Sequence, residues 1–413
     1  LEDMLYRINN GTNRNFGNNK MVNNFMNWIN GSIGATMFFN IRSATLQGLS
    51  TVNFINWGDN NILKAAAAFA NQPQFWKDFS DIFNSDMLKQ RRTGLRQDVN
   101  AAELATYVSK SKQPMRAAIN WLLQKGFLPT QMMDSFAIAM GGATMYRNRI
   151  KTYTKKGMNK KDAEAKAWQD FQEIAEETQQ SARPDKISMQ QASPLGRLIL
   201  AFQNTPMQYM RLMKKSMSDL VNGRGDNKTN VSKIIYYGAV QNLIFYSLQS
   251  ALFALAFSDD EDDEKFLKKK GRVANGMVDG ILRGLGVGGA VVSTAKNMVI
   301  KFIEEEKKEA WRKEEASLIV EMLNLSPPIG IKARKIISAM KTWNYNKKVR
   351  QNMDLLDIDN PTWQAMTNVI EATTNIPLAR LLNKTMNVRE ALNQQNEAWQ
   401  RVAMLMGWNR WDV

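Results

Sequence analysis

The stretch IIYYGAVQNLIFYSLQSALFALAF, residues 234–257, is the longest part of the chain without a charged side chain. As one continuous helix it would reach about 36 Å, enough to cross the roughly 30 Å hydrocarbon core of a bilayer. Its polar and small positions fall on one arc of the helix, and the rest of the circumference is mostly apolar. The positions on this arc are Gly238, Gln241, Asn242 and Gln249. Such a helix suits a membrane bundle with a hydrogen-bonded interior, and it suits the buried core of a water-soluble fold equally well.

The following segment, VANGMVDGILRGLGVGGAVVS at 273–293, carries a glycine at every fourth position. The row consists of Gly276, Gly280, Gly284 and Gly288. A glycine costs about 1 kcal/mol in a helix interior, so four on one face predict the close approach of another backbone. This spacing is typical of membrane helices, and tight packing in a water-soluble fold would also explain it. Asp279 and Arg283 are four residues apart and are expected to neutralise each other.

Together the two segments predict a hydrophobic helical hairpin over residues 234–300. The run between them, SDDEDDEKFLKKKGR at 258–272, is expected to form a solvated turn, because it lacks the ligand spacing and the glycine of a calcium loop. A G-x-G-x-x-G match in the glycine-rich segment follows no predicted strand and is therefore a weak indication of a nucleotide site.

Apolar spacings of three and four recur along the 413 residues, while period-two alternation is almost absent. The sequence therefore predicts an all-α protein, an elongated multi-helix assembly around the central hairpin. Breaks at RPDKIS and NLSPPIG divide it into three expected modules. These are an N-terminal helical module (1–182), a central module with the hairpin (183–323) and a C-terminal helical module (324–413). The expected helices include 33–50, 130–152, 160–182, 361–374 and 377–406.

The chain contains neither Cys nor His. This excludes disulfides, thiolate metal sites, cysteine nucleophiles, Ser-His-Asp triads and imidazole bases. Glu173, Glu176 and Glu177 are placed on the polar face of an amphipathic helix, a structural pattern that does not identify an acid–base pair. We therefore expect a protein that is not an enzyme, with no catalytic residue, no metal site and no cofactor.

The balance of 55 Lys and Arg against 39 Asp and Glu gives a net charge of +16. Such a field favours partners that carry phosphate, either nucleic acid or an anionic membrane surface. Two acid-free clusters lie beside aromatic residues and are candidates for phosphate contact, although a solvated face explains either cluster as well. The candidate residues are Arg147, Arg149, Lys151, Lys155, Lys156, Lys332, Arg334, Lys335, Lys347 and Lys348. No base-reading motif accompanies them, so contact with DNA is expected to be insensitive to sequence.

Five distinctive segments are spread over nearly the whole chain. They are NGSIGATMFFNIRSATLQGLSTVNFINWGDNN (30–61), FANQPQFWKDFSDIFNSDMLKQRR (69–92), DSFAIAMGGATMYRNRI (134–150), SPLGRLILAFQNTPMQYMRL (193–212) and NIPLARLLNK with WQRVAMLMGWNRWDV (within 375–413). These segments resemble the C-terminal region of very large tailed-phage proteins, the giant virion-associated polypeptides that are often described only as structural or polyvalent. No active-site motif of the enzymatic modules found in some members is present, so the resemblance brings no catalytic residue.

The resemblance implies an ejection protein that lies in the virion interior or at the portal or tail, and in the host cell envelope during infection. It would help to form a conduit for DNA across that envelope. The implied partners are further copies of the chain in a homo-oligomer, other virion proteins (portal, tail or internal), genomic DNA by non-specific phosphate contact, and the host membrane after release.

Two alternatives stay open at the level of the sequence. The first is a structural virion protein that contacts portal, tail or packaged DNA and never inserts into a membrane. The second is an accessory module of an enzyme located elsewhere in a longer polypeptide. The second is suggested by the start at Leu1, which we interpret as a processed product or a fragment.

Overall fold

The computed structural model describes residues 5, 20–55, 59–92, 121, 123, 125–179, 187–201, 203–240, 263–306, 315–355 and 357–408. Within these residues the chain consists of helices and their connections and holds no strand, which confirms the all-α prediction. The division into three modules stays a prediction.

Helix α9 (Leu128–Lys155) is the centre of the N-terminal half. Pro129 lies in its first turn, where a missing backbone N–H costs nothing. Its middle, AIAMGGATM at 137–145, is built largely from small side chains, and most of these residues are buried. The elements packed around α9 are α3 (Ile41–Gly48), the 3-10 helix η1 (Leu49–Phe54), α4 (Ile62–Ala70), α5 (Gln72–Phe83), α6 (Asp86–Arg92) and α10 (Lys160–Thr178).

Two adjacent glycines let these neighbours approach α9 closely. A Cβ added to Gly141 would lie 2.5 Å from the backbone oxygen of Thr51, and one added to Gly142 would overlap the ring of Phe171. The rings of Phe54 and Phe171 stack in the resulting core with their centroids 6.0 Å apart. The small residues of α9 therefore set the distance to both η1 and α10.

The middle of the chain continues with α11 (Met189–Ala192), α12 (Pro194–Ile199), α13 (Asn204–Val221) and α14 (Asn227–Ile235). A single π-helical turn, η2 (Tyr236–Val240), follows α14. The Tyr236 hydroxyl donates a hydrogen bond of 2.6 Å to the Val52 carbonyl oxygen, and this bond ties the start of the stretch 234–257 to η1. The later part of that stretch lies outside the described residues, so its role as membrane span or core helix is untested.

Two further helices form a hairpin, α16 (Asp263–Gly284) and α17 (Val287–Glu306). This hairpin is not the predicted one, which paired 234–257 with 273–300. Its two helices come from the charged run and the second predicted arm, and most of the first arm lies outside the described residues. The C-terminal helices are α18 (Glu315–Leu323), α19 (Pro327–Tyr345), α20 (Lys347–Asn352), α21 (Pro361–Thr374), α22 (Leu378–Leu392) and α23 (Ala398–Leu405). Helix α2 (Lys20–Met37) packs against both α19 and α21, so the first described helix of the chain contacts helices near its end.

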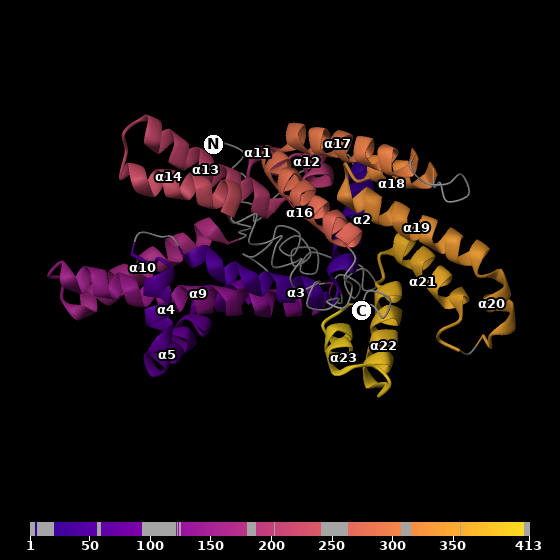
Figure 1. Cartoon of the computed structure of the whole chain (residues 1–413), viewed down its shortest axis with the longest axis horizontal. Coiled ribbons are helices and arrows are strands. Elements are labelled where there is room, and N and C mark those ends of the chain that lie inside the picture. The colour runs from indigo at the N-terminus through magenta and orange to yellow at the C-terminus, as the bar shows by residue number, and fades with distance from the viewer. Residues whose placement is uncertain are drawn as a thin grey trace.

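Figure 1 shows how these helices are arranged. Helices α9 and α10 extend towards one end of the long axis, and α19 and α20 extend towards the other. Helices α16 and α17 lie between the two ends, along the upper side of the view. The hairpin and the C-terminal helices thus follow one another in space as they do in sequence.

Several predicted helix boundaries are confirmed and others are wrong. The helix over 361–374 is α21. Those over 130–152 and 160–182 exist as α9 and α10, but α9 runs longer at both ends and α10 already ends at Thr178, because Gln179 has an extended backbone. The helix over 33–50 is instead broken after α2, where Phe39 has φ of 44° and the Asn40 side chain accepts from the Ser43 N–H. The helix over 377–406 is two helices, because Glu397 and Gln400 form a capping box that starts α23.

The charged run 258–272 also differs from its prediction. Helix α16 begins at Asp263, so the second part of the expected solvated turn is helical. Acidic residues in a first turn and the Glu264–Lys268 spacing of four both favour a helix.

Candidate interaction surfaces

The glycine-rich segment is not one helix. Helix α16 ends at Gly284 and α17 begins at Val287, with Gly286 at φ of 88° between them. The predicted row of four glycines on one face is therefore wrong, because Gly288 belongs to the second helix. Gly276 is half-buried, Gly280 and Gly284 are buried, and Gly288 is exposed.

The close backbone approach that the glycines predicted is confirmed at Gly284. A Cβ on this residue would lie 2.8 Å from the Pro206 backbone oxygen and 3.3 Å from the Met210 Cβ, both in α13. A Cβ on Gly288 would meet nothing within 4 Å. The neighbour is thus a helix of the same fold. Of the other predicted hairpin positions, Gly238 of η2 is half-buried beside Met213 of α13. Gln241, Asn242 and Gln249 lie outside the described residues.

These two glycines provide a matched test. Gly284→Leu should lower the free energy of unfolding by about 2–3 kcal/mol, because α13 blocks the added side chain. Gly288→Leu should change it by less than about 1 kcal/mol, since the site is open and leucine favours a helix. Urea denaturation followed by far-UV circular dichroism measures both values. A larger loss for Gly288→Leu than for Gly284→Leu would contradict the packing of α16 on α13.

The surface between α16 and α17 is polar. The Asp279 carboxylate pairs with the Lys296 ammonium at 2.9 Å, and it accepts hydrogen bonds from Ser293 and Asn297 at 2.6 and 2.8 Å. The Arg283 Nε donates to the Ser293 hydroxyl at 3.1 Å, and Lys296 also reaches Asn275. The spacing of four predicted that Asp279 and Arg283 neutralise each other directly. This prediction is wrong, because each side chain bonds to residues of α17 instead. Both side chains point across to α17.

The outer surface of the same hairpin is apolar. Val278 and Ile281 of α16 are exposed, and so is Leu285 in the turn that follows it. Helix α17 carries a continuous exposed stripe, because its apolar side chains recur at helical spacing on one side. We call this the α17 stripe, and it consists of Val291, Val292, Val299, Phe302 and Ile303. The hairpin thus pairs its polar groups across a largely half-buried seam and exposes apolar side chains on its outer surface, the reverse of an ordinary surface hairpin.

Within the described part of the chain, no helix combines the length and the apolar character needed to cross a membrane.

The first basic cluster contains arginines that form ion pairs within the fold and lysines that are exposed to solvent. The Arg147 guanidinium donates to the Asp78 carboxylate at 2.7 Å, and the Arg149 Nε lies 3.4 Å from Asp59 and 3.6 Å from Asp170. Lys151, Lys155 and Lys156 are exposed where α9 ends, and the exposed Lys160 and Lys161 begin α10. Of the predicted phosphate contacts in this cluster, the three lysines lie on an open basic tip and the two arginines form internal ion pairs.

The second basic cluster divides in the same way. Lys332 is 5% exposed, and its ammonium donates to the Ala372 carbonyl oxygen at 2.7 Å and the Asn375 Oδ1 at 2.6 Å. Burial lowers the pKa of Lys332 to about 8. The Lys335 ammonium pairs with the buried Glu371 carboxylate at 2.9 Å. Arg334, Lys347 and Lys348 are exposed, so these three keep the surface position that phosphate contact requires.

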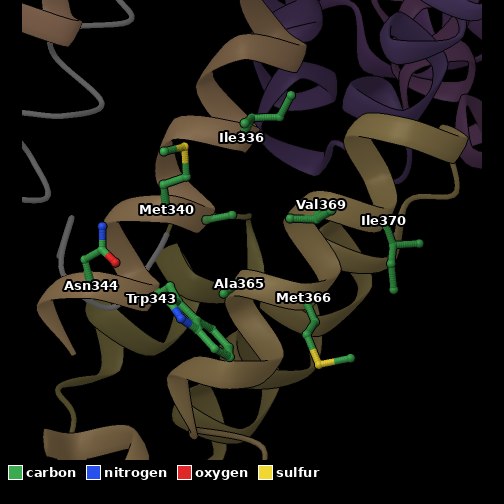
Figure 2. A pocket seen from close by; sticks show the side chains of 9 residues that line it. Ile336, Met340, Trp343, Asn344, Ala365, Met366, Val369 and Ile370 are labelled. Carbon is green, nitrogen blue, oxygen red and sulfur yellow. The ribbon is translucent and has the colours of Figure 1, made fainter. Parts of the chain in front are cut away.

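An open apolar groove lies between α19 and α21, and Figure 2 shows it. It encloses about 480 Å³, and Asn344 is its only polar lining residue. Ile336 and Trp343 lie towards opposite ends of the α19 wall in this view, and Met366 and Val369 line the α21 wall. At the Trp343 end, the Arg350 guanidinium lies 3.5 Å from the centre of the indole ring. We call this the α19–α21 groove.

One further polar group of the N-terminal half was missed by the sequence analysis. Glu176, predicted on the polar face of its helix, is buried with Asp134 around the fully buried Arg91. The Arg91 Nη2 lies 2.9 Å from the Asp134 Oδ2, and its Nη1 lies 4.0 Å from the Glu176 Oε1. The prediction for Glu176 is therefore wrong. Its helix is buried on more than one side, and the guanidinium compensates both carboxylates inside the core.

The α19–α21 groove and the α17 stripe were missed as well. The spacing of Ile336, Met340 and Trp343 already indicates one apolar helix face, but such a face is ordinarily core. Only the structure shows that these side chains stay exposed. Comparison with family models, curated proteins and solved structures gives no match.

Proposed function

We propose that this protein is a non-enzymatic phage ejection protein, which leaves the virion with the genome and helps to form a conduit for DNA across the host envelope. The observation that carries the proposal is the reversed polarity of the α16–α17 hairpin. Its polar groups bond to one another across the seam, and its apolar side chains face outward.

This arrangement suits a hairpin that moves from a protein assembly to a lipid surface. In a bilayer environment every polar group needs a partner within the protein, and the Asp279–Lys296 pair with its hydrogen bonds meets that need. The α17 stripe supplies apolar area for contact with the acyl chains at the headgroup boundary. The proposal therefore places the hairpin at the membrane interface after release, together with the stretch 234–257.

The charge of the chain supports the DNA part of the proposal. A net charge of +16 and the exposed tip formed by Lys151, Lys155 and Lys156 suit non-specific contact with the phosphates of packaged or passing DNA. The proposed partners are further copies of the chain, other virion proteins, genomic DNA and, after release, the host membrane. The proposed location is the virion interior or its portal or tail region.

A dye-release assay with vesicles of phosphatidylethanolamine and phosphatidylglycerol tests the membrane part. The purified chain should release the dye, and a Val299→Asn/Phe302→Ser variant should release it about tenfold more slowly, because it removes apolar area from the α17 stripe. Val221→Ser is the matched control, since Val221 of α13 is 85% exposed and lies outside the hairpin. This control should leak at the wild-type rate. The membrane role fails if the folded wild-type chain releases no dye at any protein-to-lipid ratio or pH.

A second candidate is a structural virion protein that contacts portal, tail or packaged DNA without membrane insertion. The packing of Gly284 against Pro206 and Met210 favours it, because the glycine face is already occupied by α13 of the same fold. In that case the wild type and all hairpin variants should give the same absence of leakage, and the chain should still be recovered with intact virions.

A further inference from the structure

The α19–α21 groove has a charged end. From Leu323 to Met353 the chain contains no Asp or Glu. Arg350 covers the Trp343 ring at one end of the groove, and Lys347 and Lys348 of α20 are exposed in the same short helix. An occupant of this groove should therefore be apolar along its length and acidic at one end.

The α17 stripe has those properties. Its exposed apolar side chains run from Val291 to Ile303, a length of about 18 Å at 1.5 Å per residue. The stripe is therefore longer than the groove wall, where Ile336 and Trp343 are roughly 10 Å apart along α19. The stripe ends next to the exposed residues Glu304 and Glu306 at the C-terminus of α17. An apolar helix with an acidic end thus meets an apolar groove with a basic end.

We propose that the α17 stripe of one copy docks in the α19–α21 groove of a second copy, with Glu304 and Glu306 at the Arg350 end. In this orientation Phe302 lies near Trp343 and Met366, and Val292 lies towards Ile336 and Val369. The groove is not filled by α17 of its own copy, because that helix is held against α16 and α18 on the same chain.

The proposed contact joins two different surfaces of the chain. Such a head-to-tail contact closes into a ring when the rotation between copies allows it, and otherwise extends as a filament. It also covers the apolar α17 stripe before any membrane is met. The inference specifies how the copies of the chain named in the proposed function meet, and this contact requires no bilayer and no DNA.

Disulfide cross-linking tests the contact directly, since the chain contains no cysteine of its own. Phe302→Cys and Met366→Cys chains are purified separately, mixed in lipid-free buffer and oxidised. The mixture should give a cross-linked dimer, while each variant alone should give little. A chain carrying both substitutions should give a ladder of higher multiples. Val221→Cys mixed with Met366→Cys is the control for random collision, and Val291→Cys with Met366→Cys tests the orientation, because Val291 lies at the far end of the stripe.

A charge-reversal series tests the orientation independently. Lys347→Glu/Lys348→Glu in the Met366→Cys chain should lower the cross-linking yield about fivefold. Glu304→Lys/Glu306→Lys in the Phe302→Cys chain should restore it. These four residues are exposed and do not line the groove, so circular dichroism should show unchanged folding.

Four results would overturn the inference. The first is a mixture of folded chains that stays monomeric in sedimentation and does not cross-link. The second is a yield equal to that of the Val221→Cys control. The third is efficient cross-linking of Met366→Cys with itself, which would indicate a symmetric groove-to-groove contact. The fourth is protection of the Met366→Cys chain from a thiol reagent by phosphatidylglycerol vesicles but not by added wild-type chain, which would make lipid the occupant. None of these depends on dye release, so the inference and the membrane proposal can fail separately.

Discussion

Replacing Arg91 with Met should lower the free energy of unfolding by about 3–5 kcal/mol at pH 7, because it leaves two buried carboxylates without their cation. Arg91 and Asp134 are both 0% exposed. The Asp134 carboxylate accepts from the Arg91 Nε at 3.0 Å and from the Gln47 side chain at 3.0 Å. Glu176 lies on the other side of the same guanidinium. Guanidinium chloride denaturation followed by circular dichroism measures the loss.

Two comparisons separate this effect from a general loss of packing. Lys89→Met lies in the same helix and removes only a surface pair with Asp86, so it should cost less than about 0.5 kcal/mol. Arg91→Met/Asp134→Asn should recover part of the loss, because it also removes one of the stranded charges. If Arg91→Met is as mild as Lys89→Met, the buried ion pair does not exist in solution.

The loss should also depend on pH. Burial raises the pKa of Asp134, while the neighbouring Arg91 lowers it. Removing Arg91 takes away the lowering influence, so the pKa of Asp134 in the folded variant should rise further above its unfolded value of about 3.9. A raised folded pKa gives stability below the unfolded pKa that is lost as the pH rises through the folded pKa. The difference between wild type and Arg91→Met should therefore shrink as the pH falls from 7 towards 4.

The second large effect is expected at Lys332, which joins the first described helix to the C-terminal helices. Its ammonium lies 4.0 Å from the centre of the Trp28 ring of α2 and donates to two acceptors around the end of α21. Lys332→Met would leave the Ala372 carbonyl and the Asn375 amide oxygen without this donor, at a cost of about 1–3 kcal/mol for each unsatisfied group. Against this, the variant no longer has to bury a charge.

The pH dependence resolves these opposing contributions. The pKa of Lys332 is lowered by burial to about 8, whereas an unfolded lysine has a pKa near 10.4. A lowered pKa gives stability that is present above the unfolded value and lost as the pH falls through the folded one. A neutral amine still donates two hydrogen bonds, so the loss caused by Lys332→Met should be larger at pH 10.5 than at pH 7, by about 2–3 kcal/mol.

Urea denaturation of wild type and variant at both pH values measures this difference. Lys348→Met is the control, because Lys348 is exposed and belongs to the same basic cluster. Its effect on unfolding should be small and the same at both pH values. A loss for Lys332→Met that does not grow with pH would mean that this lysine is solvated.

Local sequence signals predicted a helix well where its own ends are marked. Asn360 and Pro361 start α21, and Asn375 ends it with φ of 62°, so the prediction over 361–374 needed no tertiary contact. The helices expected over 33–50 and 377–406 were too long, because the Asn40 side chain and the capping box of Glu397 with Gln400 each start a new helix. Helical periodicity continues across such caps and does not reveal them.

The sequence by itself determined that the protein is all-α, that its surface is strongly basic and that imidazole or thiol chemistry is absent, because these follow from periodicity and composition. Only the tertiary structure decided which glycines of the four-residue row and which lysines of the second basic cluster are buried. Gly284 is closed by α13 while Gly288 is open, and Lys332 is buried while Lys348 is exposed. It also decided that the α16–α17 hairpin pairs its polar residues across the seam between its two helices. The physical reason is that burial is set by contacts between helices far apart in sequence, whereas periodicity reports only which residues share a face of one helix.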